Sequence, residues 1–236
     1  MGLVYRVCHR SWNTDLAVKV PRPELVATAA GRAGFGREAG TWVGLGLHPH
    51  VFACLYVRQV DAVPCVFAEW VPGGPLAELV RDGRLHTRGD DDLLARLLDL
   101  AVQMAWGIGH AHEQGLIHQD VKPANIMVAP ADGWTAEVTD LGLAGARAAA
   151  GESVLASPQA GLLAGYGGTT PAYCSPEQAD AVYGAPVTLT RATDIWSWAL
   201  SVPEMFTGGP PCAYGQSAPE VSAASWWPRH PTAHAW

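Results

Sequence analysis

The segment His118-Gln119-Asp120-Val121-Lys122-Pro123-Ala124-Asn125-Ile126 carries the strongest chemical signal in this chain. It places a carboxylate, Asp120, close to an ammonium group, Lys122, and an amide, Asn125. Phosphoryl transfer needs an acid that orients the incoming hydroxyl, a cation that meets the phosphate, and an oxygen ligand for a hard cation such as Mg²⁺. Because a random loop rarely combines these groups at this spacing, the segment predicts a phosphate-handling site.

Three histidines in the same region offer a competing interpretation, a metal site. His110 and His112 precede the segment, and His118 begins it. If a helix continues through the first two, their side chains point to different helix faces. No cysteine or third helical ligand supports them, so the metal site is the weaker interpretation.

A lysine before the segment and a carboxylate after it extend the phosphate-handling interpretation. Lys19 ends the apolar stretch Ala17-Val18, and a lysine that faces a buried site needs a counter-charge. Glu38 could supply that charge from the next helical stretch. Asp140, in Asp140-Leu141-Gly142, would be a second metal ligand. Taken alone, Lys19 would be an exposed lysine on a strand, and Asp140 would be part of an ordinary turn. Because Lys19 precedes the segment 118–126 and Asp140 follows it, the two residues support a phosphate-handling site.

The order of predicted elements indicates two lobes with a cleft between them. Strands are expected at 3–8, 16–20, 51–60 and 63–70, with a turn at 11–15 and a weak helix at 31–44. Residues 72–75 read as a hinge because proline and glycine dominate them. Helices are expected at 91–113 and 193–206, a mobile loop at 144–168, and irregular chain after 207. The apolar stripe predicted for the longer helix comprises Leu94, Leu97, Leu98, Ala101, Ala105 and Ile108.

Composition excludes several classes of protein. The apolar fraction of 49% argues against disorder, and a net charge of −7 argues against a nucleic-acid partner. Five scattered cysteines favour reduced thiols over disulfides or zinc. We find no signal peptide and no membrane segment, so a cytoplasmic location is expected.

Four short motifs in this order resemble the eukaryotic-type protein kinases, in particular the bacterial Ser/Thr kinases. The motifs are Leu16-Ala17-Val18-Lys19, His118-Gln119-Asp120, Asp140-Leu141-Gly142 and Ser175-Pro176-Glu177. Lys122-Pro123-Ala124-Asn125 is more similar to Ser/Thr enzymes than to tyrosine kinases. The resemblance covers about residues 2–220 and implies an α+β fold, with a small antiparallel β lobe plus one helix and a larger, mainly helical lobe.

The resemblance also assigns individual roles. Its catalytic residues would be Asp120, Lys122, Lys19 and Glu38. The nucleotide would contact Gly2, Val4, Ala17, Lys19, Ala68, Glu69, Val71 and Met127. The metal ligands would be Asn125 and Asp140, and structural or activating roles would fall to His118, Thr170, Glu177 and Asp194. The implied cofactors are ATP and Mg²⁺, or Mn²⁺ in its place. The implied partner is a protein substrate with a Ser or Thr hydroxyl.

Departures from the family pattern lead to further expectations. Only the end of the Gly-rich loop is present, so residues 1–71 would be an incomplete small lobe. Residues 72–220 would be a large lobe without its final helices, including an arginine that pairs with Glu177, and residues 221–236 an irregular tail. Gln119 stands where the family has arginine, which predicts less dependence on phosphorylation of the loop. Thr169, Thr170 and Ser153 are candidate phosphorylation sites.

Two other functions stay open. A kinase-like fold could bind nucleotide or partners without catalysis, since truncation could disable a site whose key residues are all present. A small-molecule phosphotransferase with a similar plan is disfavoured by residues 168–177, which resemble a peptide-docking loop.

Overall fold

The computed structural model describes residues 3–21, 23, 27, 29–61, 63–86, 92–130, 133–141, 170–182, 185 and 187–221. Several predictions lie outside these residues: the contact of Gly2 with nucleotide, the loop at 144–168, the phosphorylation sites Ser153 and Thr169, and the irregular tail at 222–236.

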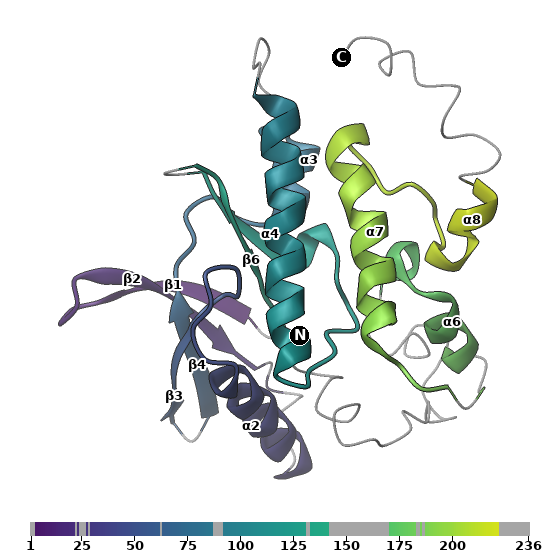
Figure 1. Cartoon of the computed structure of the whole chain (residues 1–236). Helices are drawn as coiled ribbons and strands as arrows, with labels where there is room; N and C mark the ends of the chain where they lie inside the picture. Colours follow the sequence, from purple (N-terminus) through teal and green to yellow (C-terminus); the bar gives the residue numbers. More distant parts are fainter. Residues whose placement is uncertain are drawn as a thin grey trace.

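In the described residues, the first lobe is an antiparallel sheet with helix α2 (Ala29–Gly44) packed against it, as predicted (Figure 1). Its strands are β1 (Leu3–His9), β2 (Thr14–Val20), β3 (Cys54–Val60) and β4 (Val63–Glu69), in the order β1-β2-β4-β3. Helix α2 contacts β3 and β4. The prediction that a strand begins at residue 51 is wrong, because Val51 makes isolated bridges to His48 and Val138 and β3 starts only at Cys54.

The second lobe is mainly helical and contains one short hairpin. Its helices are α3 (Leu76–Arg81), α4 (Leu93–Glu113), α6 (Pro176–Val182), α7 (Arg191–Thr207) and α8 (Ala218–Val221). Strands β5 (Ile126–Ala129) and β6 (Thr135–Val138) pair with each other, and α4 and α7 pack side by side (Figure 1). Short 3₁₀ turns lie at Pro123–Asn125, Pro171–Tyr173 and Gly215–Ser217.

Three helices were not predicted. Helices α3 and α6 have fewer than eight residues, too few for a helical period to stand out in the sequence. Helix α8 is shorter still and follows a stretch rich in proline and glycine, which had been expected to be irregular.

The buried face of α4 differs from the predicted stripe. Leu97, Ala101 and Ile108 are buried, but Leu94 and Leu98 are 44% and 50% exposed. The helix instead packs through further buried residues at helical spacing, among them Leu100, Met104 and Ala111. The sequence is apolar on more than one side of this helix, so periodicity could not tell which side would face the core.

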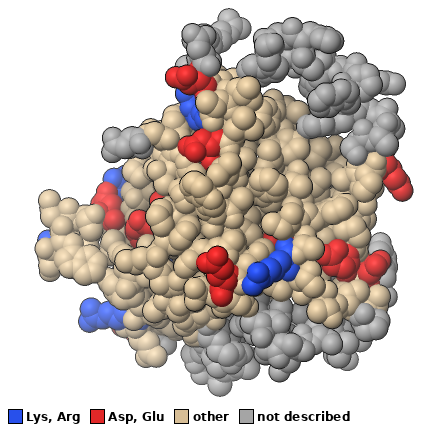
Figure 2. Space-filling view, viewed as in Figure 1, with Lys and Arg blue, Asp and Glu red and all other residues tan. Residues whose placement is uncertain are grey.

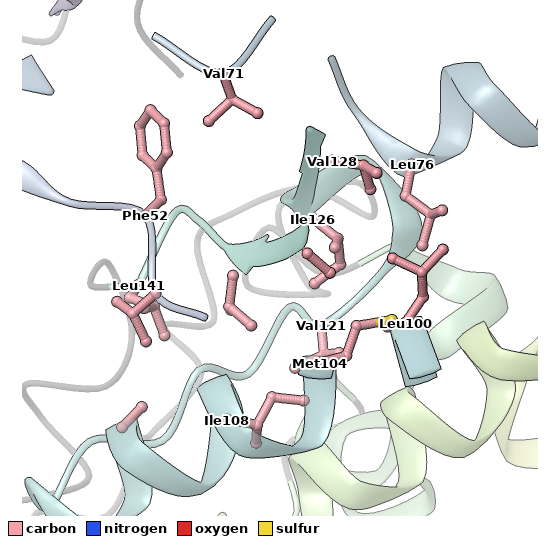
Figure 3. Packing of buried hydrophobic residues seen from close by; sticks show 14 of the residues in the cluster. Phe52, Val71, Leu76, Leu100, Met104, Ile108, Val121, Ile126, Val128 and Leu141 are labelled. Carbon is pink, nitrogen blue, oxygen red and sulfur yellow. The ribbon is translucent and has the colours of Figure 1, made fainter. Parts of the chain in front are cut away.

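One hydrophobic core runs through both lobes (Figure 3). Phe52 and Val71 belong to the same buried cluster as Leu100 and Met104 of α4 and Ile126 of β5. This continuity holds the β sheet of the first lobe against the second lobe.

Several expectations from composition can be compared with the described residues. All five cysteines are described, and they are free thiols. Among the described helices, none combines the length and apolarity that crossing a bilayer requires. On the face in Figure 2, basic residues lie singly and do not gather into a patch, and the middle of the face, over α4, is largely uncharged.

Candidate active site

The loop between α4 and β5 orients the Asp120 carboxylate. Lys122 Nζ donates to Asp120 Oδ2 at 2.6 Å, and Asn125 Nδ2 donates to the same oxygen at 3.0 Å. Asn125 Nδ2 also donates to the backbone carbonyl of Asp120 at 2.8 Å. With Oδ2 held by two donors, Oδ1 is the oxygen of Asp120 that can accept from an incoming hydroxyl.

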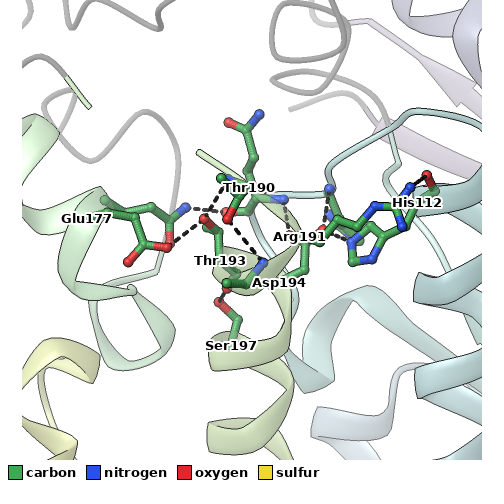
Figure 4. A network of polar contacts seen from close by, with 11 residues as sticks. His112, Glu177, Thr190, Arg191, Thr193, Asp194 and Ser197 are labelled. Atoms are coloured by element: carbon green, nitrogen blue, oxygen red, sulfur yellow. Dashed lines mark hydrogen bonds and ion pairs between the residues drawn. The ribbon is translucent and has the colours of Figure 1, made fainter. Parts of the chain in front are cut away.

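Asp194, on α7, supports this loop from beneath (Figure 4). Its side chain is fully buried, and its oxygens accept from the backbone N–H groups of His118 at 2.8 Å and Gln119 at 2.7 Å. His112 Nε2 donates to Asp194 Oδ2 at 2.7 Å. A buried carboxylate is stable only when it is hydrogen-bonded in this way.

The β5–β6 hairpin brings Asn125 and Asp140 together. The N–H of Thr139, just after β6, donates to the carbonyl of Asn125, just before β5, at 2.9 Å. His118 Nε2 donates to the carbonyl of Thr139 at 3.0 Å. This bond ties the loop between α4 and β5, the catalytic loop of the family resemblance, to the same point. Asp140 follows directly, with a positive φ of 58° that turns its side chain away from the strand direction.

Lys19 and Asp140 connect the two lobes. Lys19 Nζ, on β2, lies 2.5 Å from Asp140 Oδ1. The same ammonium group lies 5.7 Å from the centre of the Trp42 ring on α2. Glu38 is a residue of α2, but its side chain is outside the described part, so the predicted Lys19–Glu38 pair stays a prediction.

Predicted nucleotide contacts lie on paired strands of the first lobe and at its junction with the second. Ala17 pairs with Ala68 across β2 and β4, and Val4 pairs with Lys19 across β1 and β2, so each pair shares one face of the sheet. Met127, on β5, bridges to Pro75, the last of the hinge residues.

Residues 69–71, which precede the hinge, contact the segment before β3 and lie close to β6. Glu69 Oε1 accepts from the backbone N–H of Ala53 at 2.7 Å, and Val71 is buried in the common core. The carboxyl of Glu137, on β6, has its pKa raised to about 8, first by burial and then by the charge of Glu69. The sequence had predicted Glu69 only as a backbone contact for adenine.

Residues 170–178 attach to the catalytic loop and to α7. Lys122 Nζ donates to Thr170 Oγ1 at 2.8 Å, so Lys122 lies between Thr170 and Asp120. Thr193 Oγ1 donates to Glu177 Oε1 at 2.7 Å, a contact in the network of Figure 4. The family resemblance had given Glu177 an arginine partner from a later helix.

Sequence reasoning missed a partly buried pair between this segment and α7. The hydroxyl of Tyr173 donates to Glu204 Oε2 at 2.5 Å. Burial, together with Glu204, raises the pKa of Tyr173 far above its usual range, and burial raises the pKa of Glu204 as well. Tyr173 and Glu204 are 31 residues apart in the chain, and nothing in their spacing relates one to the other.

The histidine interpretation is wrong. His110 donates to the carbonyl of Leu45, His112 to Asp194, and His118 to Thr139, so each ring has a different protein partner. Among the described residues, no group of three or more His, Cys, Asp and Glu side chains is arranged to hold a metal. Asn125 and Asp140 instead offer two oxygen ligands, which suits Mg²⁺ because this ion keeps water and phosphate ligands.

Comparisons with known proteins also find protein kinases. The family described as "protein kinase domain" matches residues 1–225. Serine/threonine-protein kinase PknB of Mycolicibacterium smegmatis is 31% identical over 204 residues, which are 84% of this chain and 29% of that protein. PknB of Mycobacterium tuberculosis is also 31% identical, over 205 residues. The chain thus spans less than a third of the length of these curated relatives.

Solved structures agree on the fold. The kinase domain of PknI from Mycobacterium tuberculosis superposes with a TM-score of 0.62 and 24% identity, over 90% of this chain and 71% of that domain. A mutant form of the same domain gives a TM-score of 0.65 over 94% of this chain and 75% of that chain.

Proposed function

The chain belongs to the protein kinase family, and from this premise we propose that it is a serine/threonine kinase that transfers the γ-phosphate of ATP to a Ser or Thr hydroxyl of a protein. One observation carries the proposal. Lys19 of the first lobe meets Asp140 of the second, and the hairpin places Asp140 beside the set formed by Asp120, Lys122 and Asn125.

Asp120 would act on the incoming hydroxyl. The hydroxyl oxygen forms a bond to the γ-phosphorus as the bond from that phosphorus to the ADP oxygen breaks, and the hydroxyl proton passes to Asp120. Oδ1 is the acceptor because Oδ2 already accepts from Lys122 and Asn125. Holding the carboxylate in one orientation contributes to rate by positioning the nucleophile in advance.

The cationic groups would stabilise the phosphates. Lys122 lies next to Asp120 and can meet the transferred phosphoryl group, while Lys19 can meet the phosphates nearer the nucleoside. Asn125 and Asp140 would hold Mg²⁺, or Mn²⁺ in its place, and the bound ion would neutralise charge on the phosphates. The 2.5 Å contact between Lys19 and Asp140 supports this arrangement, because it joins the lysine of the first lobe to the proposed metal ligand of the second.

The remaining contacts are proposed from the family. The backbone of Glu69 and Val71 would bind the adenine edge, and Ala17, Val4 and Met127 would enclose the base. Gly2, beyond the described residues, would contact the nucleotide as the end of the Gly-rich loop. Ala68, next to the proposed adenine contact Glu69, is small, and we propose that it leaves room behind the adenine. We also propose that the first lobe ends at residue 71 and the second at residue 220. The same proposal includes a protein as substrate and a cytoplasmic location.

Label transfer from ATP tests this proposal against a non-catalytic binding module. The intact chain, with Mg²⁺ and a generic protein substrate, should transfer label from [γ-³²P]ATP. Asp120→Asn and Lys19→Met should each reduce transfer by about a hundredfold or more. Transfer that survives both substitutions would refute the assigned roles. Nucleotide binding without any transfer by the wild-type chain would favour the binding module.

A further inference from the structure

The peptide that leads into Asp120 is held at both ends. Gln119 is 4% exposed and has a φ of 67°, in the left-handed region that non-glycine residues seldom occupy. Its N–H donates to Asp194 Oδ1 at 2.7 Å. Its carbonyl oxygen accepts from Gln178 Nε2, also at 2.7 Å. A strained conformation of this kind costs about 1–3 kcal/mol and persists only where the surrounding structure imposes it.

Gln178 is itself fixed in place on α6. Its side chain is 5% exposed, and its Oε1 accepts from the backbone N–H of Ser175 at 3.0 Å. Its own N–H donates to Ser175 Oγ at 3.3 Å. Because the amide oxygen is engaged by Ser175, the amide nitrogen is directed at the Gln119 carbonyl.

The segment that carries Gln178 is anchored to α7. Ser197 Oγ donates to the carbonyl of Tyr173 at 2.8 Å, and the Tyr173 hydroxyl donates to Glu204. Contacts therefore run without interruption from α7 through residues 173–178 to the peptide before Asp120. A shift of α6 would move the Gln119 carbonyl, and the Asp120 carboxylate with it.

We propose that Gln178 is a positioning residue for the transfer reaction, which sets the orientation of Asp120 by holding the carbonyl of Gln119. The role rests on the proposed kinase function. It links the placement of residues 170–178, which a peptide substrate would meet, to the placement of the group that accepts the hydroxyl proton. The simpler role for Gln178, a cap for the start of α6, uses only its contacts with Ser175.

Two substitutions separate these roles. Gln178→Glu keeps an oxygen that can accept from the Ser175 N–H but replaces the donor to Gln119 with a second acceptor. Ser175→Ala removes the hydroxyl that accepts from the Gln178 N–H and leaves the Gln178–Gln119 bond intact. Gln178→Met removes both side-chain bonds without adding charge, and serves if the glutamate variant does not fold.

The experiment measures kinetics and hydrogen exchange on the intact chain. For Gln178→Glu we expect kcat to fall about tenfold or more, with the KM for ATP changed less than about twofold, because a misplaced nucleophile slows chemistry without weakening the nucleotide. Backbone exchange in residues 116–124 should become faster. Ser175→Ala should leave kcat and this exchange near wild-type values.

The outcomes separate this proposal from the proposed function. Unchanged exchange in residues 116–124 of the Gln178 variants would overturn the positioning role, as would an equal loss of kcat in Ser175→Ala. A wild-type chain without transfer activity would overturn the kinase proposal, yet exchange would still decide whether Gln178 holds the catalytic loop.

Discussion

Many side chains of the candidate site orient one another through hydrogen bonds. Asp120 owes its orientation to Lys122 and Asn125, and Asp194 owes its stability to the amides of the loop that it supports. A residue of this kind is identified by its partners more than by its type. Thr193 is an example that no motif would have singled out.

Substituting Thr193 should destabilise the start of α7. Its Oγ1 donates to Glu177 and accepts from the N–H of Thr190 at 3.2 Å, at a side chain with no exposed surface. Thr193→Val removes both bonds at nearly constant volume, so we expect a loss of about 1–3 kcal/mol in the free energy of unfolding by urea. Thr207→Val, at an exposed hydroxyl on the last turn of the same helix, should change it by less than about 0.5 kcal/mol. Similar losses in both variants would contradict the role of Thr193.

The position of a helix or strand is set by the face that it buries. In α4, the apolar composition of the sequence does not show which face that is. Leu97 is 1% exposed and its neighbour Leu98 is 50% exposed, although both are leucines in one apolar run. The difference follows from packing against β6 and α7, which the sequence of α4 does not contain.

Adjacent leucines of α4 should therefore respond differently to truncation. Leu97→Ala leaves a cavity in the core and should cost about 2–5 kcal/mol. Leu98→Ala should change the free energy of unfolding by well under half of that amount, since half of the side chain is already in water. Urea titrations of the two variants provide the measurement. Equal costs would mean that α4 is rotated relative to the described packing.

The turn before β3 carries a histidine that should make stability depend on pH. The His48 ring stacks on His110 of α4 at 4.5 Å, beside His50 at 5.8 Å. Burial, and then the charges of His110 and His50, lower the His48 pKa from 6.5, while Glu113 opposes them. The unfolded chain therefore takes up this proton first as pH falls. Stability is fully present above about pH 6.5 and is lost as pH falls through the lowered pKa.

Replacing His48 should reduce the dependence of stability on pH. His48→Asn retains an acceptor for the N–H of His50, which donates to His48 Nδ1 at 3.2 Å, but cannot be protonated. The difference in unfolding free energy between pH 7.5 and pH 5.5 should be smaller in this variant than in the wild type, as thermal or urea unfolding can measure. A wild-type slope that the variant fully retains would exclude His48 as its source.

At the scale of the whole molecule, the lobes meet at close range where α4 passes the turn at 48–51. A side chain at Gly107 would collide with the carbonyl oxygen of His50 and come within 2.7 Å of Val138 Cγ2. The core also continues across this junction. The relative position of the lobes, and so the distance from Lys19 to Asp140, depends on this contact.

Two glycines of α4 form a matched pair that tests the junction. Gly107→Ala should cost about 1–3 kcal/mol in unfolding free energy, because backbone atoms on the facing turn cannot yield cheaply. Gly109→Ala has no atom within 4 Å of the added Cβ and should be neutral or stabilise the helix by up to about 1 kcal/mol. A destabilised Gly109 variant beside a neutral Gly107 variant would contradict the described approach of the lobes.

Much of the fold and of the candidate site could be predicted from the sequence, because local patterns specify them. Short apolar stretches indicated four strands of the first lobe, an apolar stripe indicated α4, and a second apolar run indicated α7. The motifs named Lys19, Asp120 and Asp140, and the described contacts join Lys19 to Asp140 and Asp120 to Lys122 and Asn125. These features depend on residues that lie close together in the chain.

Only the tertiary structure decided which groups meet across long stretches of sequence. Lys19 pairs with Asp140, Tyr173 with Glu204, and Gln178 with the carbonyl of Gln119. It also decided which leucines of α4 are buried. Pairing between distant groups depends on how helices and strands pack, and packing is a property of several elements at once that no single stretch of residues contains.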